Sequence, residues 1–395
     1  MLVNNADNPN ARNFLSQIDF VRQMPDQSSG LSRQVGFWQR MHIDPILMVL
    51  LLVLTVFGLC VLYSASGQTM TAVFQQARFY GVAYFGMLIV AQLDLERIKR
   101  LAPLAYLCGI GLLLAVAFLG DGAKGAQRWL NIGGFRFQPS ELMKLAVPMA
   151  VAWYFSNRAL PPKFRYVLLS IILIGIPTLL IASQPDLGTA ILIAASGLFV
   201  LFFAGVRWKF ILSFFAVALA SAYPLWQFAL RDYQRQRILT LLNPESDKLG
   251  AGWNIIQSKT AIGSGGWSGK GWLNGTQSQL DFLPESHTDF IIAVLAEEWG
   301  MQGVLMLLTI YCAIIIRGLW IGINAQHSFG RLLAGSITLT FFVYIFVNMG
   351  MVSGLLPIVG VPLPLVSQGG TSIVTLLAGF GLLMAISTEK RVIMQ

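Results

Sequence analysis

The sequence predicts an all-α integral membrane protein, a bundle of about ten transmembrane helices with one large periplasmic loop. Of the 395 residues, 55% are hydrophobic and only 11% are charged, whereas a soluble domain carries roughly 25% charged residues. Most hydrophobic runs approach the roughly 20 residues that a helix needs to cross the hydrocarbon core. These runs do not alternate apolar and polar residues, as the strands of a transmembrane β-barrel do. Composition and run length together therefore indicate the helical class.

Ten hydrophobic segments are predicted to cross the membrane, with ends placed only approximately by the sequence. An even number of spans puts both chain ends on one side, and basic residues select the cytoplasmic side. With both termini inside, 16 of the 27 Lys and Arg residues fall on the inner side, which favours this orientation. The segments are residues 45–66, 76–93, 102–120, 140–156, 166–183, 187–205, 208–227, 288–316, 331–352 and 369–387.

The spans divide the chain into two tails and a membrane domain. Residues 1–43 are predicted to form a polar cytoplasmic tail without the apolar segment of a signal peptide, so the first span is expected to direct insertion. Residues 44–388 are predicted to form the membrane domain, and residues 389–395 a cytoplasmic C-terminal tail.

Three connections on the outer side are expected to be functional. Residues 120–141 hold several basic side chains, and residues 228–287 are rich in Gly and Trp. Because connections as long as the second are usually functional, it is predicted to form a packed lid of short helices and turns. Residues 353–370 are apolar and rich in Pro and Gly. Non-helical backbone at membrane depth must be buried or line a cavity, so this stretch is predicted to be a re-entrant segment beside a site.

Asp289 stands where the large outer loop meets the predicted eighth span. A charge beside hydrocarbon costs free energy and therefore marks a candidate functional site. The competing interpretation is an acidic residue in a first helical turn, where the helix dipole stabilises an anion. Position alone leaves both interpretations open.

Glu141 and Lys144 lie three residues apart at the start of the predicted fourth span, just after Pro139. This spacing places both side chains on one helix face. An ion pair at a helix start accounts for Glu141, but a lysine inside a span is expected to face a partner or a cavity.

Arg128, Arg136 and Lys144 together could hold a doubly charged pyrophosphate. Arginine makes bidentate contacts with phosphate, and lysine adds a point charge. The alternative is that these outer basic residues contact anionic lipid headgroups.

The other polar or reactive residues are interpreted as structural. Asp186, in a short turn between two spans, is interpreted as a helix cap, and Glu297 and Glu298 are expected to pair within the bundle. The three histidines lie far apart in sequence, which argues against a zinc site. Nucleotide-binding glycine motifs and a GxSxG elbow are absent. The cysteines are interpreted as small buried hydrophobes rather than a disulfide framework: Cys60, Cys108 and Cys312.

Four stretches of the chain resemble motifs of the SEDS family of peptidoglycan polymerases. The resemblance runs from about Asp44 to the last span, and the stretches are AKGAQRWL (123–130), RFQPSELMK (136–144), QPDLGT (184–189) and FLPESHTDF (282–290). Three further stretches resemble the elongation branch of the family rather than its division branch: 254–259, 271–279 and 351–365. Gln368 departs from the family, which usually has Tyr there.

The resemblance implies a glycosyltransferase that joins lipid II units into glycan strands, with inversion, at the outer face of the bacterial inner membrane. Lipid II is a disaccharide pentapeptide linked to undecaprenyl pyrophosphate. The resemblance implies that Asp289 is the catalytic carboxylate, a general base for the acceptor hydroxyl. No cofactor is identified, and a divalent cation is left open. The candidate substrate-binding residues are Arg128, Arg136, Gln138, Glu141, Lys144 and Lys259.

The family also implies partners. They are a class B penicillin-binding protein, which is a transpeptidase, other elongation-complex proteins and membrane lipids, with no nucleic acid. Small residues let membrane helices pack closely, so the transpeptidase is expected to dock on those of the eighth and ninth spans: Gly300, Gly303, Ala334, Gly335 and Ser336. Three rival functions stay open: a lipid II flippase, a division-type polymerase and a non-catalytic scaffold.

Overall fold

The computed structural model describes residues 41–119, 121–123, 126–132, 135–230, 232–247, 250–279 and 285–389. Residues 1–41 and 42–395 form two separate units. Most of the predicted N-terminal tail and residues 390–395 of the predicted C-terminal tail lie outside the described part. The large predicted loop is described except for residues 231, 248–249 and 280–284.

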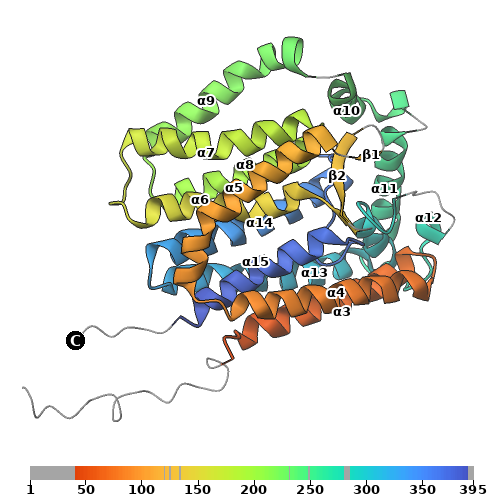
Figure 1. Ribbon diagram of the computed structural model, residues 1–395. Coiled ribbons are helices and arrows are strands. Elements are labelled where there is room, and N and C mark those ends of the chain that lie inside the picture. Colours follow the sequence, from red (N-terminus) through yellow and green to blue (C-terminus); the bar gives the residue numbers. More distant parts are fainter. Residues whose placement is uncertain are drawn as a thin grey trace, which may run out of the picture. The chain divides into compact units, whose positions relative to one another are not determined.

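Each predicted span overlaps a long helix (Figure 1). Five of the described helices, α3, α5, α7, α13 and α14, are long and apolar enough to cross a membrane, and α8 and α15 are shorter apolar helices. The predicted class, a multi-pass helical membrane protein, is confirmed. The helices are α3 (Pro45–Ala65), α4 (Met70–Ala91), α5 (Leu95–Leu119), α6 (Pro139–Ser156), α7 (Phe164–Ser183), α8 (Leu187–Phe203), α9 (Trp208–Pro224), α13 (Ile291–Asn324), α14 (Ser328–Val352) and α15 (Thr371–Ser387).

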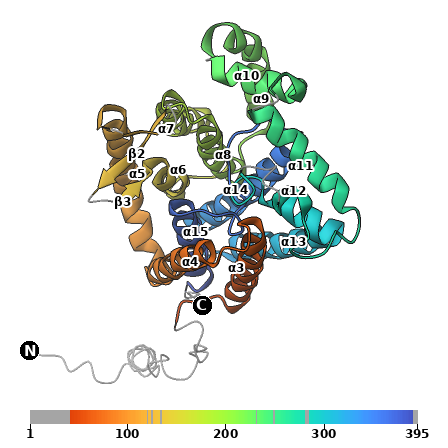
Figure 2. The ribbon, with the colours of Figure 1, turned by 90° about the vertical axis from the view of Figure 1, so that its right-hand side faces the viewer.

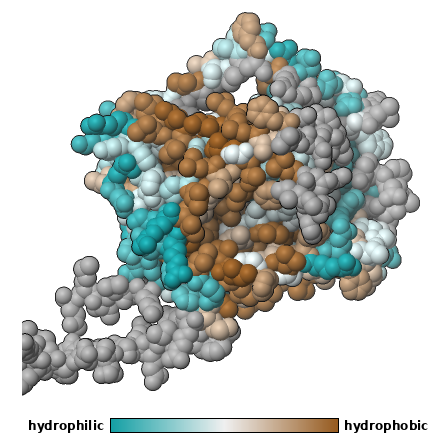
Figure 3. Space-filling model, in the orientation of Figure 1, coloured by the Kyte–Doolittle hydropathy of each residue, from teal (hydrophilic) through white to brown (hydrophobic). Residues whose placement is uncertain are grey.

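The outer surface of the bundle matches a hydrocarbon environment. Figure 3 shows a broad hydrophobic area over the middle of one face, with hydrophilic residues gathered toward its left and right edges. Large apolar side chains such as Phe74, Phe85 and Leu179 are exposed. The cysteines are free, as predicted, but the prediction that they are buried is wrong, because all three are exposed: Cys60, Cys108 and Cys312. Apolar spans can leave thiols exposed because their surroundings there are hydrocarbon rather than water.

Polar caps and prolines mark where helices begin. Asp44 accepts a hydrogen bond from the backbone N–H of Leu47 at 3.0 Å, and Pro45 takes the first turn of α3. The same carboxylate accepts bonds from both the Nη2 and Nε atoms of Arg317 in α13, at 2.7 and 3.2 Å. Asp44 therefore both starts α3 and joins it to the far end of α13.

Two late helices lie in the centre of the bundle. Seen from the end in Figure 2, α14 and α15 are surrounded by the other helices. In the most apolar window of α14, 67% of the residues are buried, compared with 28% in α5 and α7. Polar side chains on α14 are therefore expected to face other parts of the protein rather than lipid.

The connections gather at one end of the bundle. A three-stranded antiparallel sheet, in the order β1-β2-β3, occupies the predicted first loop: β1 (Asp121–Ala123), β2 (Ala126–Ile132) and β3 (Phe135–Phe137). The sequence analysis did not predict this sheet. The first of the short helices, η1 (Leu225–Ala229), begins inside the predicted seventh span. The described part of the large loop contains short helices, as predicted: α10 (Asp232–Leu242), η2 (Pro244–Asp247), α11 (Ala251–Gly265) and α12 (Thr276–Gln279). Figure 1 shows the sheet, α10, α11 and α12 at the right.

The start of α3 and the end of α15 meet at the opposite end of the bundle, at the left of Figure 1. Nδ1 of His42 and Oγ1 of Thr388 share a hydrogen bond of 3.2 Å. The two ends of the membrane domain therefore lie together, as an even number of spans requires.

Residues 353–370, called the re-entrant segment below, leave the helical pattern, and Val361 to Ser367 of this stretch are mostly buried. The prediction of non-helical backbone buried in protein is therefore confirmed for this half, and its position in the membrane stays a prediction. Val361, Leu363 and Leu365 are at most 4% exposed. Three side chains from two helices hold its carbonyl groups. Tyr80 of α4 donates to Leu365 at 2.8 Å, Tyr311 of α13 donates to Pro364 at 2.7 Å, and Gln76 of α4 donates to Ser367 at 3.2 Å.

The small residues that were predicted to form a docking surface are buried inside the bundle. A Cβ atom on Gly335 would lie 2.5 Å from Cε2 of Phe203 in α8. Ser336 donates a hydrogen bond to the carbonyl of Ser196 in α8 at 2.6 Å. The predicted docking surface is therefore wrong, because these small residues let helices of the same chain approach closely. The other members of the set are also buried: Gly300, Gly303 and Ala334.

Gly335→Leu is expected to destabilise the bundle itself by about 1–3 kcal/mol or more, because overpacking forces backbone shifts. Thermal unfolding of the purified protein in detergent measures this effect. The matched control is Gly81→Leu in α4, where an added Cβ meets no atom within 4 Å. Equal unfolding temperatures for the two variants would contradict the assigned packing.

Candidate active site

A cavity of about 650 Å³ lies at the end of the bundle that holds the small sheet. Its volume is in the range of ligand pockets, roughly 300–1,000 Å³. The starts of α6 and α8, Trp129 of β2 and Tyr344 of α14 line it, together with Gly360–Pro362 of the re-entrant segment. Its lining includes these polar side chains: Gln138, Glu141, Lys144, Asp186, Thr371 and Ser372.

Glu141 and Lys144 form the ion pair that their spacing predicts. Nζ of Lys144 lies 2.6 Å from Oε1 of Glu141, and the two side chains are only 11% and 6% exposed. Oε2 of Glu141 accepts a hydrogen bond from Oγ1 of Thr375 at 2.8 Å. Nζ of Lys144 also lies 5.0 Å from the centre of the Tyr344 ring. Lys144 thus has both a partner and a cavity, as expected of a lysine inside a span.

Gln138 and Asp186 connect the starts of α6 and α8. Nε2 of Gln138 donates to Oδ2 of Asp186 at 3.1 Å. Oδ1 of Asp186 accepts from the backbone N–H of Thr189 at 3.4 Å, which confirms that it caps α8. The sequence analysis did not predict that this cap also lines the cavity and contacts a candidate substrate-binding residue.

Asp289 lies in a turn, residues 285–290, just before α13. The N-cap of α13 is Phe290, so Asp289 precedes the first helical turn rather than lying within it. Oδ2 of Asp289 is 3.5 Å from the position that a Cβ on Gly360 would take. Gly360 has φ +70°, a conformation that favours glycine, and it lines the cavity. The Asp289 carboxylate therefore lies beside Gly360 of the cavity wall, although Asp289 itself is not one of the lining residues.

Three elements hold this turn in place. Oγ of Ser286 donates to the carbonyl of Ala65 at the end of α3, at 3.1 Å. The backbone N–H of Gln368 in the re-entrant segment donates to the carbonyl of His287 at 3.0 Å. Nδ2 of Asn348 in α14 donates to the carbonyl of Asp289 at 2.8 Å. The carboxylate is therefore carried by a turn with few ways to move.

Three predicted substrate-binding residues remain: Arg128, Arg136 and Lys259. Arg128 lies in β2, and Arg136 lies in β3, where it pairs with Asn131 of β2. The side chains of both arginines lie outside the described part of the structure. Lys259, on α11, is exposed and lies beside Gly354, so it does not belong to the cavity lining. Gln138, Glu141 and Lys144 are thus the predicted substrate-binding residues that the cavity brings together.

Sequence reasoning missed Thr375, Tyr344 and Asn348 as members of this region. Each is a polar residue inside an otherwise apolar span, and this is the signal that could have identified them. Among the described residues, no group of three or more His, Cys, Asp or Glu side chains is arranged to hold a metal ion.

Comparison with known proteins places this chain in a family. The family model FTSW_RODA_SPOVE, described as "Cell cycle protein", matches residues 45–392. The chain belongs to this family. It is 52% identical over 359 residues to "Peptidoglycan glycosyltransferase MrdB" of Escherichia coli K12, covering 90% of this chain and 96% of that protein. It is 36% identical to "Probable peptidoglycan glycosyltransferase FtsW" of Geobacter metallireducens, covering 88% and 95%.

Solved structures of the family have the same fold. One, named "Structural coordination of polymerization and crosslinking by a peptidoglycan synthase complex", has a TM-score of 0.76 and 30% identity, covering 87% of this chain and 97% of that chain. The crystal structure of Thermus thermophilus Rod shape determining protein RodA has a TM-score of 0.66 and 27% identity, covering 87% and 96%.

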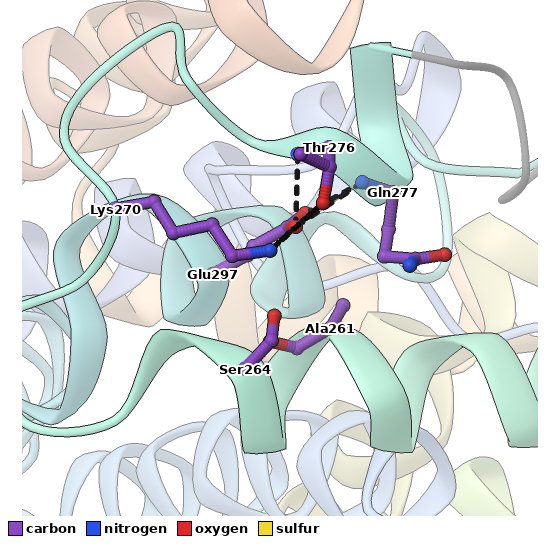
Figure 4. A network of polar contacts seen from close by, with 6 residues as sticks. All are labelled: Ala261, Ser264, Lys270, Thr276, Gln277 and Glu297. Carbon is purple, nitrogen blue, oxygen red and sulfur yellow. Dashed lines mark hydrogen bonds and ion pairs between the residues drawn. The ribbon is translucent and has the colours of Figure 1, made fainter.

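In this family member, two adjacent carboxylates of α13 hold the segment that precedes α12. Oε1 of the fully buried Glu297 lies 2.6 Å from Nζ of Lys270. It also accepts bonds from the backbone N–H groups of Thr276 at 2.9 Å and Gln277 at 3.1 Å (Figure 4). Glu298 accepts a hydrogen bond from Ser64 of α3. The predicted pairing of both glutamates within the protein is therefore confirmed, and their partners are now identified.

The same segment inserts at a kink in α13. Gly300 has φ +63°, which interrupts the helix. The N–H groups of Met301 and Gln302 donate to the carbonyls of Gly266 at 3.0 Å and Trp267 at 3.2 Å. In return, the N–H of Lys270 donates to the carbonyl of Glu297 at 3.0 Å. The backbone groups freed by the kink are thus satisfied by the large loop.

Lys270→Met is expected to loosen residues 270–279, because it removes a charge-assisted bond from a buried carboxylate, a bond of about 1.5–3 kcal/mol. Amide hydrogen exchange at Thr276 and Gln277 should accelerate by at least about tenfold, which corresponds to 1.4 kcal/mol. Lys259→Met, which removes an exposed lysine from the neighbouring α11, is the control. Unchanged exchange at both amides in Lys270→Met would show that the ion pair does not hold this segment.

Proposed function

We propose that this protein is a peptidoglycan glycosyltransferase that polymerises lipid II into glycan strands at the outer face of the inner membrane during cell elongation. The observation that carries the proposal is the cavity: its lining includes the buried Lys144, and Gly360 of its wall lies beside the Asp289 carboxylate. The relatives support the reaction, since proteins 52% and 36% identical to this chain are named peptidoglycan glycosyltransferases. The elongation role is supported by the likeness to the Rod shape determining protein RodA.

The proposed reaction transfers a sugar from a lipid-linked pyrophosphate to a hydroxyl group. Asp289 accepts the proton of the acceptor hydroxyl as its oxygen attacks the anomeric carbon of the donor. The new glycosidic C–O bond forms on the face opposite the leaving group, and the bond to the pyrophosphate breaks. The undecaprenyl pyrophosphate leaves with the bonding electron pair, and its growing negative charge must be stabilised.

Lys144 supplies positive charge for that leaving group. In the free protein, Glu141 neutralises this lysine at 2.6 Å, which offsets part of the cost of burying it. Thr375 and Tyr344 hold the pair in place from α15 and α14. Gln138 adds an amide donor at the same wall, and Arg128, Arg136 and Lys259 are proposed to contact the pyrophosphate or the sugars as the substrate binds.

We further propose that both termini are cytoplasmic, which the larger share of basic residues on that side supports. His42 and Thr388 meet at one end of the bundle, and the cavity lies beside the sheet at the other end. With both termini cytoplasmic, the cavity opens toward the periplasm. There a polyprenyl pyrophosphate donor can present its headgroup while its lipid chain stays in the bilayer.

An apolar groove on the bundle is a candidate docking site for a partner helix. It has a volume of about 380 Å³ between α11, α13 and α14, and its apolar lining includes Met301, Phe342 and Phe346. The single span of a class B penicillin-binding protein is proposed to dock there. A related chain comes from a peptidoglycan synthase complex that coordinates polymerisation and crosslinking.

The main alternative is a lipid II flippase. A carrier is expected to bind its substrate near the bilayer midplane, whereas Lys144 lies about 8 Å from the start of α6 at 1.5 Å per residue. Purified protein is incubated with lipid II in detergent, where no membrane separates two compartments. Glycan product under these conditions shows a polymerase, because a flippase only moves lipid II from one compartment to another.

Asp289→Asn is expected to fold normally and to lose about 10²–10⁴-fold in polymerisation rate, because the general base is removed. Initial rates of glycan formation from fluorescent lipid II measure the loss, with the thermal unfolding temperature as the control for folding. Wild-type turnover in this variant would reject the assignment of Asp289, whereas absence of glycan product from the wild-type protein would favour the scaffold alternative.

Lys144→Ala is expected to impair use of lipid II far more than Arg97→Ala. Lys144 is buried at the cavity, whereas Arg97 is exposed and pairs only with the exposed Asp94, a pair worth about 0.2–1 kcal/mol. The KM for lipid II and the rate at saturating substrate are measured for both variants. Equal effects would favour contact with lipid headgroups over contact with the pyrophosphate.

A further inference from the structure

Asn348 places a carboxamide inside the most deeply buried helix of the bundle. The side chain is 0% exposed and lies on α14, four residues before the end of that helix at Val352. Its Nδ2 atom donates two hydrogen bonds of 2.8 Å, one to the carbonyl of Asp289 and one to the carbonyl of Val361. A buried amide in a membrane span is costly unless its polar atoms are bonded.

The chemistry of these contacts fixes the orientation of the amide. Both partners are carbonyl oxygens, which only accept, so the NH₂ group must face them, and its two hydrogens match the two acceptors. Oδ1 of Asn348 accepts no hydrogen bond from the described residues. An unsatisfied acceptor in the interior costs free energy. The side chain is therefore suited to donating in this position and not to accepting.

The two carbonyls belong to the two surfaces that meet at the catalytic carboxylate. Asp289 lies on the turn before α13, and Val361 lines the cavity as part of the re-entrant segment. Gly360, next to Val361, lies beside the Asp289 carboxylate, since a Cβ built there would lie 3.5 Å from Oδ2. One amide therefore sets the spacing between the base and the wall on which the substrate is proposed to lie.

Other buried side chains hydrogen-bond to the re-entrant segment without also contacting the Asp289 turn. Tyr80 donates to Leu365, and Tyr311 donates to Pro364. Both hydroxyls hold the segment to a neighbouring helix, at residues beyond the cavity-lining stretch Gly360–Pro362. They provide natural controls, because losing either one costs a buried hydrogen bond of the same segment.

We propose that Asn348 is a positioning residue for glycosyl transfer, holding the Asp289 turn against the Gly360–Val361 wall of the cavity. This inference rests on the proposed function. It assigns Asn348 no contact with substrate. Its effect acts through the geometry of Asp289, and a displacement of about 1 Å from the productive arrangement can cost on the order of 10²-fold in rate.

The test compares Asn348→Leu, Asn348→Ser and Tyr80→Phe in the purified full-length protein, using fluorescent lipid II. Leucine has a similar size and no donor, and serine keeps one donor. We expect Asn348→Leu to lower kcat by about 10–100-fold with KM for lipid II within about twofold of wild type, because proton transfer requires a base held in place. Asn348→Ser should fall between Asn348→Leu and the wild type. Tyr80→Phe should keep kcat within about threefold of wild type while losing one neutral hydrogen bond.

Thermal unfolding temperatures and amide exchange at residues 285–290 are measured on the same samples. Faster exchange in this turn for both Asn348 variants, but not for Tyr80→Phe, supports the positioning role. Wild-type kcat in Asn348→Leu would overturn the inference, and so would losses in Tyr80→Phe equal to those in Asn348→Leu. If Asn348→Leu does not fold, kcat and amide exchange of Asn348→Ser are compared with those of Tyr80→Phe instead, and a wild-type kcat in Asn348→Ser overturns the inference.

Wild type and Asp289→Asn are assayed in parallel. Wild-type protein without glycan product would reject the proposed function and this inference with it. An Asp289→Asn variant as active as wild type would leave the polymerase activity in place but reject the role of Asp289, and this inference with it. An inactive Asp289→Asn variant beside a fully active Asn348→Leu variant would reject the inference alone.

Discussion

Every peptide group that leaves helical geometry inside this bundle must find its hydrogen bond within the protein, because hydrocarbon offers none. The re-entrant segment 353–370 and the kink at Gly300 both break helical geometry. The side chains of Gln76, Tyr80 and Tyr311 satisfy the first, and the backbone of Gly266–Lys270 satisfies the second. These bonds allow an irregular backbone to exist there, and the irregular backbone forms the cavity.

The same constraint connects the cavity to the large loop. Glu297 and Glu298 lie just before the kink, and Figure 4 shows the Glu297 carboxylate next to Lys270, Thr276 and Gln277 of the large loop. A carboxylate buried at this depth would be very costly alone. Glu297 is instead surrounded by a lysine, a hydroxyl and two backbone N–H donors. The loop that leads toward Asp289 and the helix that follows Asp289 are thereby joined at a second point.

Charge inside the bundle is used in compensated pairs. Lys144 with Glu141, Lys270 with Glu297 and Arg317 with Asp44 are each separated by 2.6 or 2.7 Å. The first pair lies in the cavity lining, the second holds the loop and the third joins α3 to α13 at the far end. Burial makes each pair sensitive to the loss of one partner, since the remaining charge is then left in an apolar interior. Of the three pairs, only Lys144 and Glu141 line the cavity, where an incoming anion can reach the lysine.

The sequence by itself determined the helical membrane class, because run length and hydropathy depend on composition alone. It also determined the Glu141–Lys144 pair and the cap at Asp186, because these contacts lie within one helix turn. It did not reveal that Gly335 packs on Phe203, that Asp186 meets Gln138, or that Asn348 joins Asp289 to Val361, since 132, 48, 59 and 13 residues separate these partners along the chain. Such contacts depend on which helices become neighbours, and a period of 3.6 residues identifies the buried face of a helix without identifying what covers it. Only the tertiary structure decided that the small residues around Gly335 serve packing within the chain. It also decided that the carboxamide of Asn348 on α14 bonds both the turn that carries Asp289 and the cavity-lining Val361.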